Sequence, residues 1–395
     1  MPVFDNDHTG QRIAAYRKKA GLTQRGLAAR IPYSYSLVRQ VEDGSRTASS
    51  GYIAAAAAVL CVDPAVLKGQ PYVTELQQDQ LMGLIRPIRE ALDLYDLGGD
   101  PDVTVRTPVQ LIAAADELCR KVRATKLHAV ASQLPDVITE LTAAAYRSPS
   151  TSLWQALGST YRTAHDVATK LGFPDLSTVA LDRMGWAADR ASDPLLGAAR
   201  QYMRALTYFR SGECTVGFRL IDAGRRHLQQ ADPHQRDTLA VSGQLHLGAA
   251  VLHARADDAD AVTTHLTEAE NLARRTGEAG EVLWMSFGPT NVKLHRTSTL
   301  IEMRKFGEAV EQSQGLVFPT AWSASRVAHH HVHRSYALME TRRQEQALGE
   351  LITARRIAPE QTRYYPPARE TIRALVRQAR RTPDTLDHLA AWISM

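Results

Sequence analysis

The chain has 395 residues, a formal net charge of +5, and a composition that is 44% hydrophobic and 23% charged. This length and balance indicate a globular protein of two or three domains with a large core. No segment approaches the length of an apolar membrane span, which excludes a membrane-spanning protein.

The opening residues MPVFDNDHTGQ lack the basic, apolar and small regions of a secretory signal, so we expect a cytoplasmic protein. Three cysteines, Cys61, Cys119 and Cys214, are odd in number and widely spaced. This pattern favours buried free thiols over disulfides or a zinc site.

The positive charge is concentrated near the start of the chain. Residues 1–70 contain nine Lys or Arg and five acidic residues, whereas the other 325 residues contain 38 and 37. A small basic domain joined to a neutral body fits a polyanion-binding domain, with a solvated basic face as the alternative.

Five short helices are predicted in this basic segment. Gly21 ends the first helix, Thr23 and Ser34 are N-caps of the second and third, Pro32 ends the second, and Gly44 ends the third. The expected ranges are 10–20, 24–31, 34–43, about 49–60 and 64–68.

The third helix has two distinct faces. Leu37, Val38 and Val41 are expected to face inward. The outward face then carries polar and aromatic side chains, which are Tyr35, Ser36, Arg39, Gln40 and Asp43.

These residues closely resemble the Cro/C1-type helix-turn-helix family, also called the XRE family, from about Gly10 to Gly69. The resemblance rests on GLTQ (21–24), LA (27–28), Ser34, Val38, Val41-Glu42-x-Gly44, and L…VDPxxL (60–67). One departure is the stretch 31–33, Ile-Pro-Tyr, where the family usually has a glycine in the turn.

The resemblance implies that the third helix lies in the major groove of DNA. It implies contacts from Gln24, Arg25, Ser34, Tyr35, Ser36, Arg39, Gln40 and Arg46, with Lys18 and Lys19 as weaker phosphate contacts. Arg39 suits a guanine edge, Gln40 an adenine edge, and Tyr35 a thymine methyl or a phosphate. Arg17 and Glu42 match the family's internal ion pair.

From Glu75 onward, apolar residues recur at helical spacing in segments of 15–22 residues, which are separated by short Gly, Pro or Asp breaks. About fifteen further helices are expected, arranged as an α-solenoid. The predicted fold is therefore all-α. Three domains are expected: 1–72 for DNA binding, 73–150 as a helical linker or dimerisation region, and 151–395 as helical repeats.

A tetratricopeptide-like pattern is clearest at residues 333–359, where Ala347, Leu351, Ala354 and Pro359 have the spacing of a second repeat helix. Looser copies begin at Val262 and Ala309. The chain thus resembles bacterial regulators that join an XRE domain to such a body, and SFGPTNVKLHR (286–296) resembles a block of actinobacterial members. Some relatives bind short peptides on the concave surface, which implies an effector-binding body.

An effector site is predicted on the segment 280–301. Trp284, Phe287, Asn291 and His295 are expected on one helical stripe, where the Asn amide would bind a peptide backbone and the rings would form pocket walls. Arg296 is a further candidate, and Gly288-Pro289 is expected to interrupt the helix and open the groove there. The alternative is that Trp284 and Phe287 belong to the core between hairpins.

No motif predicts catalysis. The cluster AHHHVHR (328–334) places two histidines one helical turn apart but has no third ligand, so no metal is expected. There is no GxxxxGK[ST], no GxGxxG after a strand and no GxSxG, so neither a cofactor nor an enzyme is expected.

The sequence therefore predicts a DNA-binding transcriptional regulator that forms a homodimer on an inverted-repeat operator and senses a peptide or small-molecule effector. A homodimer is expected because one such domain reads only a few base pairs. The alternative is a DNA-tethered scaffold whose solenoid binds a protein partner.

Overall fold

The computed structural model describes residues 8–70, 75–98, 100–212, 214–320, 322–379 and 383–394. Within these ranges the chain forms helices and has no strand, apart from an isolated bridge between Ala279 and Phe287. The all-α prediction is confirmed.

Residues 8–70 form a small domain, called the head below. Its five helices match the predicted order and are α1 (Thr9–Lys19), α2 (Gln24–Ala28), α3 (Tyr35–Glu42), α4 (Ser50–Leu60) and α5 (Pro64–Lys68). The hydroxyls of Thr23 and Ser34 cap α2 and α3 as expected, accepting from the backbone N–H of Gly26 (3.0 Å) and Leu37 (3.3 Å). The head has its own apolar core, centred on Ile13, Leu27, Val38, Tyr52 and Leu67.

The turn between α2 and α3 does not need a glycine. None of residues 31–33 has a positive φ, and the Tyr33 N–H donates to the Ile31 carbonyl at 2.7 Å. The Tyr33 ring also packs against the Tyr52 ring, with centroids 5.1 Å apart. The unusual Ile-Pro-Tyr turn is thus compatible with the helix-turn-helix geometry and adds a contact to α4.

The remaining helices form the body, defined as residues 75–394. They are α6 (Glu75–Asp93), α7 (Pro108–Arg123), α8 (Leu127–Arg147), α9 (Thr151–Leu171), α10 (Pro174–Ala191), α11 (Pro194–Ser211), α12 (Cys214–Leu228), α13 (Arg236–Arg255), α14 (Ala259–Thr276), the 3-10 turn η1 (Val282–Trp284), α15 (Pro289–Glu302), α16 (Phe306–Gln312), α17 (Ala324–Glu340), α18 (Gln344–Ile357), α19 (Pro359–Tyr364), α20 (Pro366–Gln378) and α21 (Asp384–Ser394). Proline at the first position of many of these helices suits a helix start, where the N–H would have no partner.

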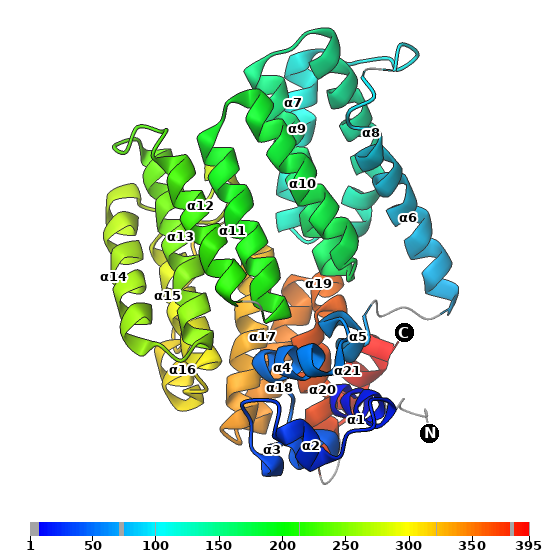
Figure 1. Cartoon of the computed structure of the whole chain (residues 1–395), viewed down its shortest axis with the longest axis vertical. Coiled ribbons are helices and arrows are strands. Elements are labelled where there is room, and N and C mark those ends of the chain that lie inside the picture. The colour runs from blue at the N-terminus through cyan, green and yellow to red at the C-terminus, as the bar shows by residue number, and fades with distance from the viewer. Residues whose placement is uncertain are drawn as a thin grey trace.

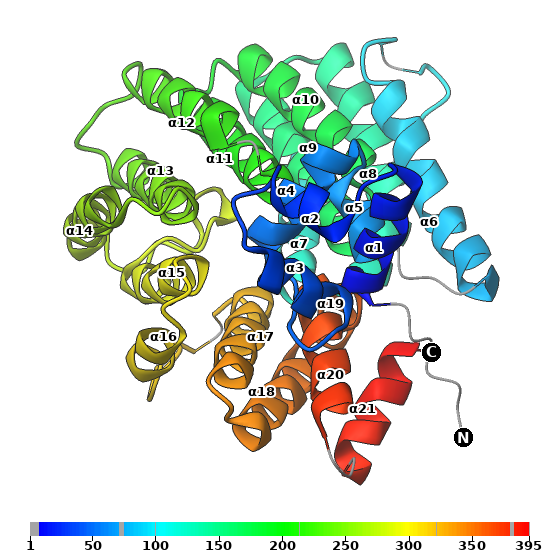
Figure 2. The same ribbon diagram turned by 60° about the horizontal axis from the view of Figure 1, so that its bottom comes forward.

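Successive helices pack as hairpins, such as α9 with α10, α11 with α12, α13 with α14, and α17 with α18 (Figure 1). The hairpins follow one another around a curved body, and the head lies across it (Figure 2). In the clearest predicted repeat, Ala347, Leu351 and Ala354 are wholly buried, so these positions do pack between helices.

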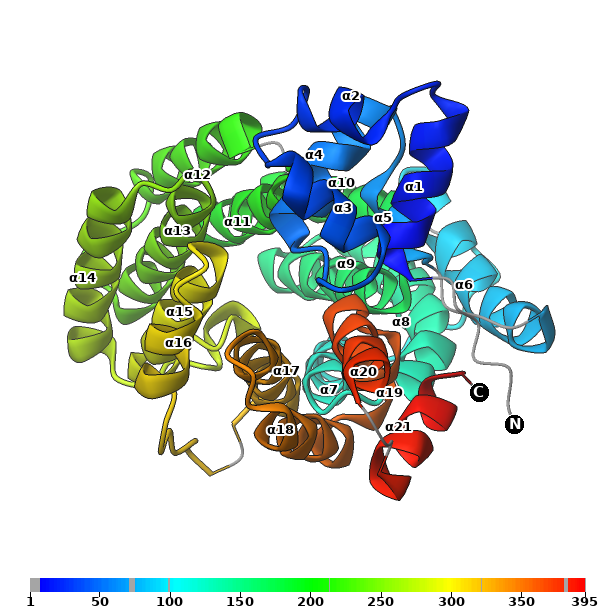
Figure 3. The same cartoon turned by 90° about the horizontal axis from the view of Figure 1, so that it is seen from below.

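The curved body closes on itself. Helix α17 contacts α7, and α19 contacts α9, so that the inner helices surround a central space (Figure 3). At this closure the backbone N–H and ring Nδ1 of His128 lie 3.0 Å and 2.9 Å from Glu360 Oε2. The Glu360 hydrogen bond raises the pKa of His128.

Residues 73–150 were expected to be a linker or a dimerisation region. Helices α6, α7 and α8 contribute apolar side chains to the same core as α9–α15, so they begin the body. The expectation of three buried thiols is wrong for Cys61, which is exposed at the C-terminal end of α4, whereas Cys119 is buried. None of the described helices is long and apolar enough to cross a membrane.

Candidate nucleic-acid interface

The N-terminal half of α3 faces solvent. Ser34, Tyr35, Ser36 and Arg39 are exposed, and Gln40 is partly exposed. Val38 and Val41 are buried beneath them, while Leu37 is partly buried. The helix thus has an apolar side fixed in the head core and a polar side free to meet a ligand.

A buried ion pair fixes α3 to α1. The Arg17 guanidinium donates two hydrogen bonds to the Glu42 carboxylate, at 2.6 Å and 2.8 Å, and a third to the Leu22 carbonyl at 2.6 Å. The hydrogen bonds that Arg17 donates to Glu42 raise the pKa of Arg17. The ion pair implied by the sequence is therefore present, and it holds the orientation of α3.

Helix α2 is joined to the same carboxylate. The Gln24 side-chain amide donates to Glu42 Oε2 at 2.9 Å, so Gln24 braces α3. On the outer side, the Arg25 guanidinium lies over the Tyr35 ring, 5.4 Å from its centroid. Arg25 and Tyr35 therefore form one exposed surface that spans the start of α2 and the start of α3.

Residues 8–68 match a family model described as a helix-turn-helix domain. The head is a helix-turn-helix domain. This assignment supports DNA binding by the head. No match was found among curated proteins or among solved structures.

Arg46 occupies a different setting from the other candidate DNA contacts. Its Nη2 lies 3.6 Å from Glu340 Oε2 on α17, so the guanidinium pairs with the body. Burial raises the pKa of Glu340, and Arg46 acts against this shift. Arg46 can therefore contact a DNA phosphate only after its ion pair with Glu340 is broken.

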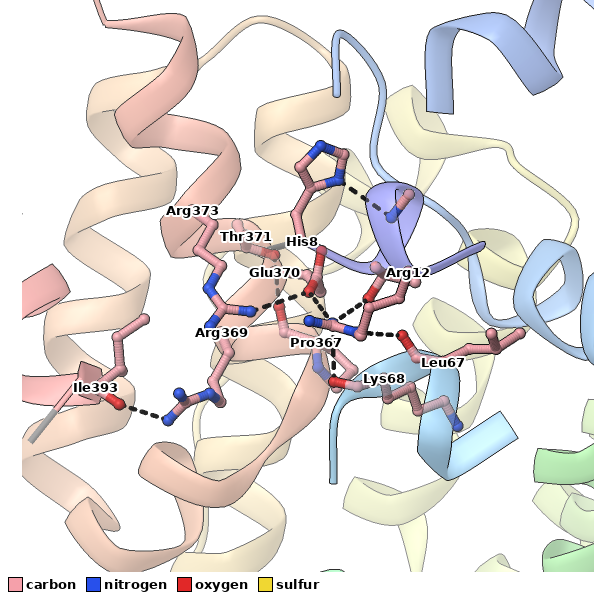
Figure 4. Close-up of polar contacts among 12 residues, drawn as sticks. His8, Arg12, Leu67, Lys68, Pro367, Arg369, Glu370, Thr371, Arg373 and Ile393 are labelled. Atoms are coloured by element: carbon pink, nitrogen blue, oxygen red, sulfur yellow. Dashed lines mark hydrogen bonds and ion pairs between the residues drawn. The ribbon is translucent and has the colours of Figure 1, made fainter. Parts of the chain in front are cut away.

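A second junction joins the start of α1 to α20 (Figure 4). Arg12 Nη2 lies 3.6 Å from Glu370 Oε1, and the same guanidinium donates to the carbonyls of Leu67 (2.8 Å) and Lys68 (3.0 Å). Arg377 Nε also donates to the Gly44 carbonyl at 3.2 Å. These contacts dock the head on the body through α1, α5 and the turn after α3, and none of them involves the exposed side chains of α3.

The predicted effector stripe on residues 280–301 is not continuous. Trp284 lies in η1, positive φ angles occur at Leu283, Trp284 and Ser286, and α15 begins only at Pro289. Phe287 is wholly buried and packs against Gly243 on α13, so it belongs to the core and does not form a pocket wall. The stripe is thus broken from Leu283 onward, ahead of the interruption expected at Gly288-Pro289, where α15 begins.

Asn291 and His295 belong to a buried polar network. The Asn291 amide donates to Gln244 Oε1 (3.1 Å), and the Gln244 amide donates to the Tyr202 hydroxyl (2.7 Å). Arg326 donates to Asn291 Oδ1. Burial lowers the pKa of His295 to about 3. This network lies among inner helices, and Gln244 and Arg326 were not identified from the sequence because they lie 47 and 35 residues from Asn291.

Arg296 and the histidine cluster lie elsewhere. Arg296 is partly exposed and pairs with Glu270 at 3.3 Å, away from the network. The rings of His329 and His333 are in contact, with centroids 4.0 Å apart and planes tilted by 41°. His333 Nε2 lies 2.9 Å from the Tyr365 hydroxyl. Within the described ranges, no three His, Cys, Asp or Glu side chains are grouped so that they could hold a metal ion.

Proposed function

We propose that this protein is a sequence-specific transcriptional regulator of the XRE type, in which α3 reads base edges in the major groove and the tetratricopeptide-like body senses an effector. The observation that supports this most is the exposed surface of Ser34, Tyr35, Ser36 and Arg39, held on a rigid helix by the buried Arg17–Glu42 pair. A fixed backbone with free polar side chains is what base readout requires.

The proposal includes a homodimer. One head offers about four outward side chains, which is enough for only a few base pairs, and two heads one helical turn apart would supply operator specificity. An inverted repeat with half-sites about 10 base pairs apart is the operator that this arrangement fits.

The experiment is selection of bound sequences from random DNA by the purified full-length protein at near-physiological salt. Recovery of an inverted repeat supports the proposal. Arg39→Ala should then relax the preference at one position of each half-site by about 1–3 kcal/mol, whereas Arg25→Ala should weaken binding to every sequence and reduce the salt slope by about 1.

Recovery of no sequence preference, together with binding that vanishes as salt rises, would contradict it, because phosphate attraction alone has this behaviour. The alternative of a DNA-tethered scaffold would then gain support. It predicts a protein partner that stays bound to the body during purification.

A further inference from the structure

The central space of the body contains a polar cavity of about 180 Å³. A single water molecule needs about 10–15 Å³ on the same measure, so the cavity has room for a small organic molecule. Inner helices α7, α9, α11, α13, α17 and α19 all contribute side chains to its wall, as does η1.

The cavity wall is strongly cationic. It carries five basic side chains, which are Arg123, Arg162, Lys170, Arg210 and Arg326, against a single carboxylate, Asp166. Asp166 Oδ2 lies 4.0 Å from Arg162 Nε, so it offsets one charge at most. Burial and the neighbouring cations lower the pKa of Arg123 to about 9 and of Lys170 to about 8, which leaves both groups mainly charged at pH 7.

Several of these cations also have donors without acceptors. Arg162 Nε and Nη1, Arg123 Nε and Arg326 Nε are buried and have no hydrogen-bond partner in the part of the chain that the structure describes. Arg162 is 7% exposed, and its remaining Nη2 donates to the Trp284 carbonyl at 3.0 Å, which fixes the guanidinium in place. Buried charged donors without acceptors destabilise the folded protein. A bound group with negatively charged oxygens would supply the missing acceptors.

The rest of the wall suits the body of an organic molecule. Met203, Leu206 and Trp284 provide apolar surface, and Gln361 and Ser325, which are hydrogen-bonded to each other, provide polar groups. Apolar walls with a few fixed polar groups are typical of small-molecule sites.

We propose that this cavity binds a small organic anion that carries at least two negative charges on phosphate or carboxylate groups, with Arg162, Lys170 and Arg326 as its main partners. This names the class of effector for the body. Its consequence for DNA rests on the proposed function, whereas binding of the anion does not.

The cavity adjoins the head, because α11, which carries Arg210, contacts α4 of the head. Arg210 lines the cavity, and after burial it is the largest contributor lowering the pKa of Lys68 on α5 of the head, to about 8. An anion beside Arg210 reduces this like-charge repulsion and therefore stabilises the docked head. Since Arg46 is paired with Glu340 in that arrangement, bound anion should lower the affinity for DNA.

The test is titration calorimetry of the full-length protein with pyrophosphate and with citrate, at an ionic strength held constant with chloride. We expect saturable binding of one anion per chain. Arg162→Gln and Lys170→Gln should each weaken it about tenfold or more, since hydrogen bonds between charged groups contribute about 1.5–3 kcal/mol. Binding of pyrophosphate alone would assign a phosphate ligand, and binding of citrate alone a carboxylate ligand.

Controls separate this site from the basic head and from misfolding. Arg39→Ala on α3 and Arg296→Gln on the outer surface should bind the anion like the unchanged protein. Lys170→Gln should not lower the melting temperature of the free protein, because it removes a partly buried charge that neighbouring cations repel. Absence of saturable binding, or binding that survives both cavity variants and is lost in Arg39→Ala, would overturn the proposal. If the protein bound the anion but showed no DNA sequence preference, the anion site would be supported. Only the proposed function in DNA recognition would be contradicted.

Discussion

At the scale of single residues, Glu42 is the central group of the head. It accepts from Arg17 on α1 and from Gln24 on α2, and it lies on α3 itself. One carboxylate thereby fixes the relative positions of three helices. Because the Arg17 and Glu42 side chains are only 8% and 5% exposed, water screens the pair weakly.

Glu42→Ala should destabilise the head strongly, because it leaves the Arg17 charge buried without a partner. We expect the free energy of unfolding of the head to fall by about 3–5 kcal/mol. Hydrogen exchange of the α1–α3 amides in the full-length protein measures this change. The matched control is Glu90→Ala, which breaks the exposed Arg86–Glu90 pair on α6 and should cost about 0.3–0.5 kcal/mol. Equal effects of the two substitutions would contradict this role for Glu42.

At the scale of elements, α13 and the segment before α15 are in close contact. A Cβ atom added at Gly243 would lie 2.0 Å from the Phe287 ring, so only glycine allows this approach. Gly349 on α18, in contrast, has open space around it.

Gly243→Ala should therefore destabilise the body by about 1–3 kcal/mol through overpacking, whereas Gly349→Ala should stabilise α18 by about 0.5–1 kcal/mol. Urea unfolding followed by circular dichroism would measure both changes. If Gly243→Ala proved neutral, Phe287 would have to move without cost, contrary to its complete burial.

The contact between α17 and the head carries a second prediction at this scale. Glu340→Gln removes the charge that pairs with Arg46 and should release the guanidinium for a phosphate. For this partly exposed pair the gain is about 0.5–1 kcal/mol, or two- to fivefold in DNA affinity, measured by fluorescence anisotropy with a selected operator. Glu345→Gln, an exposed position on α18, is the control and should have no effect. A loss of affinity in Glu340→Gln would show that the docked head is the one that binds DNA.

At the scale of the whole molecule, buried and partly buried histidines make the folded state sensitive to acid. Burial is the main cause that lowers the pKa of seven of the described histidines: His165, His246, His265, His295, His329, His330 and His333. The unfolded chain takes up protons at these groups near pH 6.5, while the folded chain does so only at lower pH. Stability is therefore unaffected above about pH 7 and falls as the pH drops below 6.5.

His295→Gln should lower the number of protons that the chain takes up on unfolding by about one. The slope of the unfolding free energy against pH should then fall by about 1.4 kcal/mol per pH unit between pH 6 and pH 4. The pKa of His295 is about 3 because of burial and because Arg326 and His333 on α17 repel its charged form. Urea unfolding between pH 7.5 and pH 5 measures the slope, with the exposed His234→Gln as the control. An unchanged slope in His295→Gln would contradict the buried neutral state of this ring.

The head could be predicted from the sequence in detail, because its signals are local. Thr23 and Ser34 are caps whose partners lie three residues away, and the apolar spacing of Val38 and Val41 defines the buried side of α3. The helical nature of the body follows in the same way from its periodic apolar residues. The sequence marks an interruption at Gly288-Pro289, but local spacing could not predict the positive φ angles between Leu283 and Ser286, which remove the helical stripe drawn through Trp284 and Phe287.

The amino-acid sequence by itself determined the five-helix head, the exposed residues of α3 and the serial helices of the body, since each depends on contacts within a few turns of chain. Only the tertiary structure decided the rest. Ring closure brings α17 and α19 against α7 and α9, and it gathers cations from positions 123 to 326 around one cavity. It also places Glu340 and Glu370 beside Arg46 and Arg12. Such pairings between distant residues leave no periodic pattern in the sequence, because they depend on how the hairpins curve and not on the spacing within any one helix.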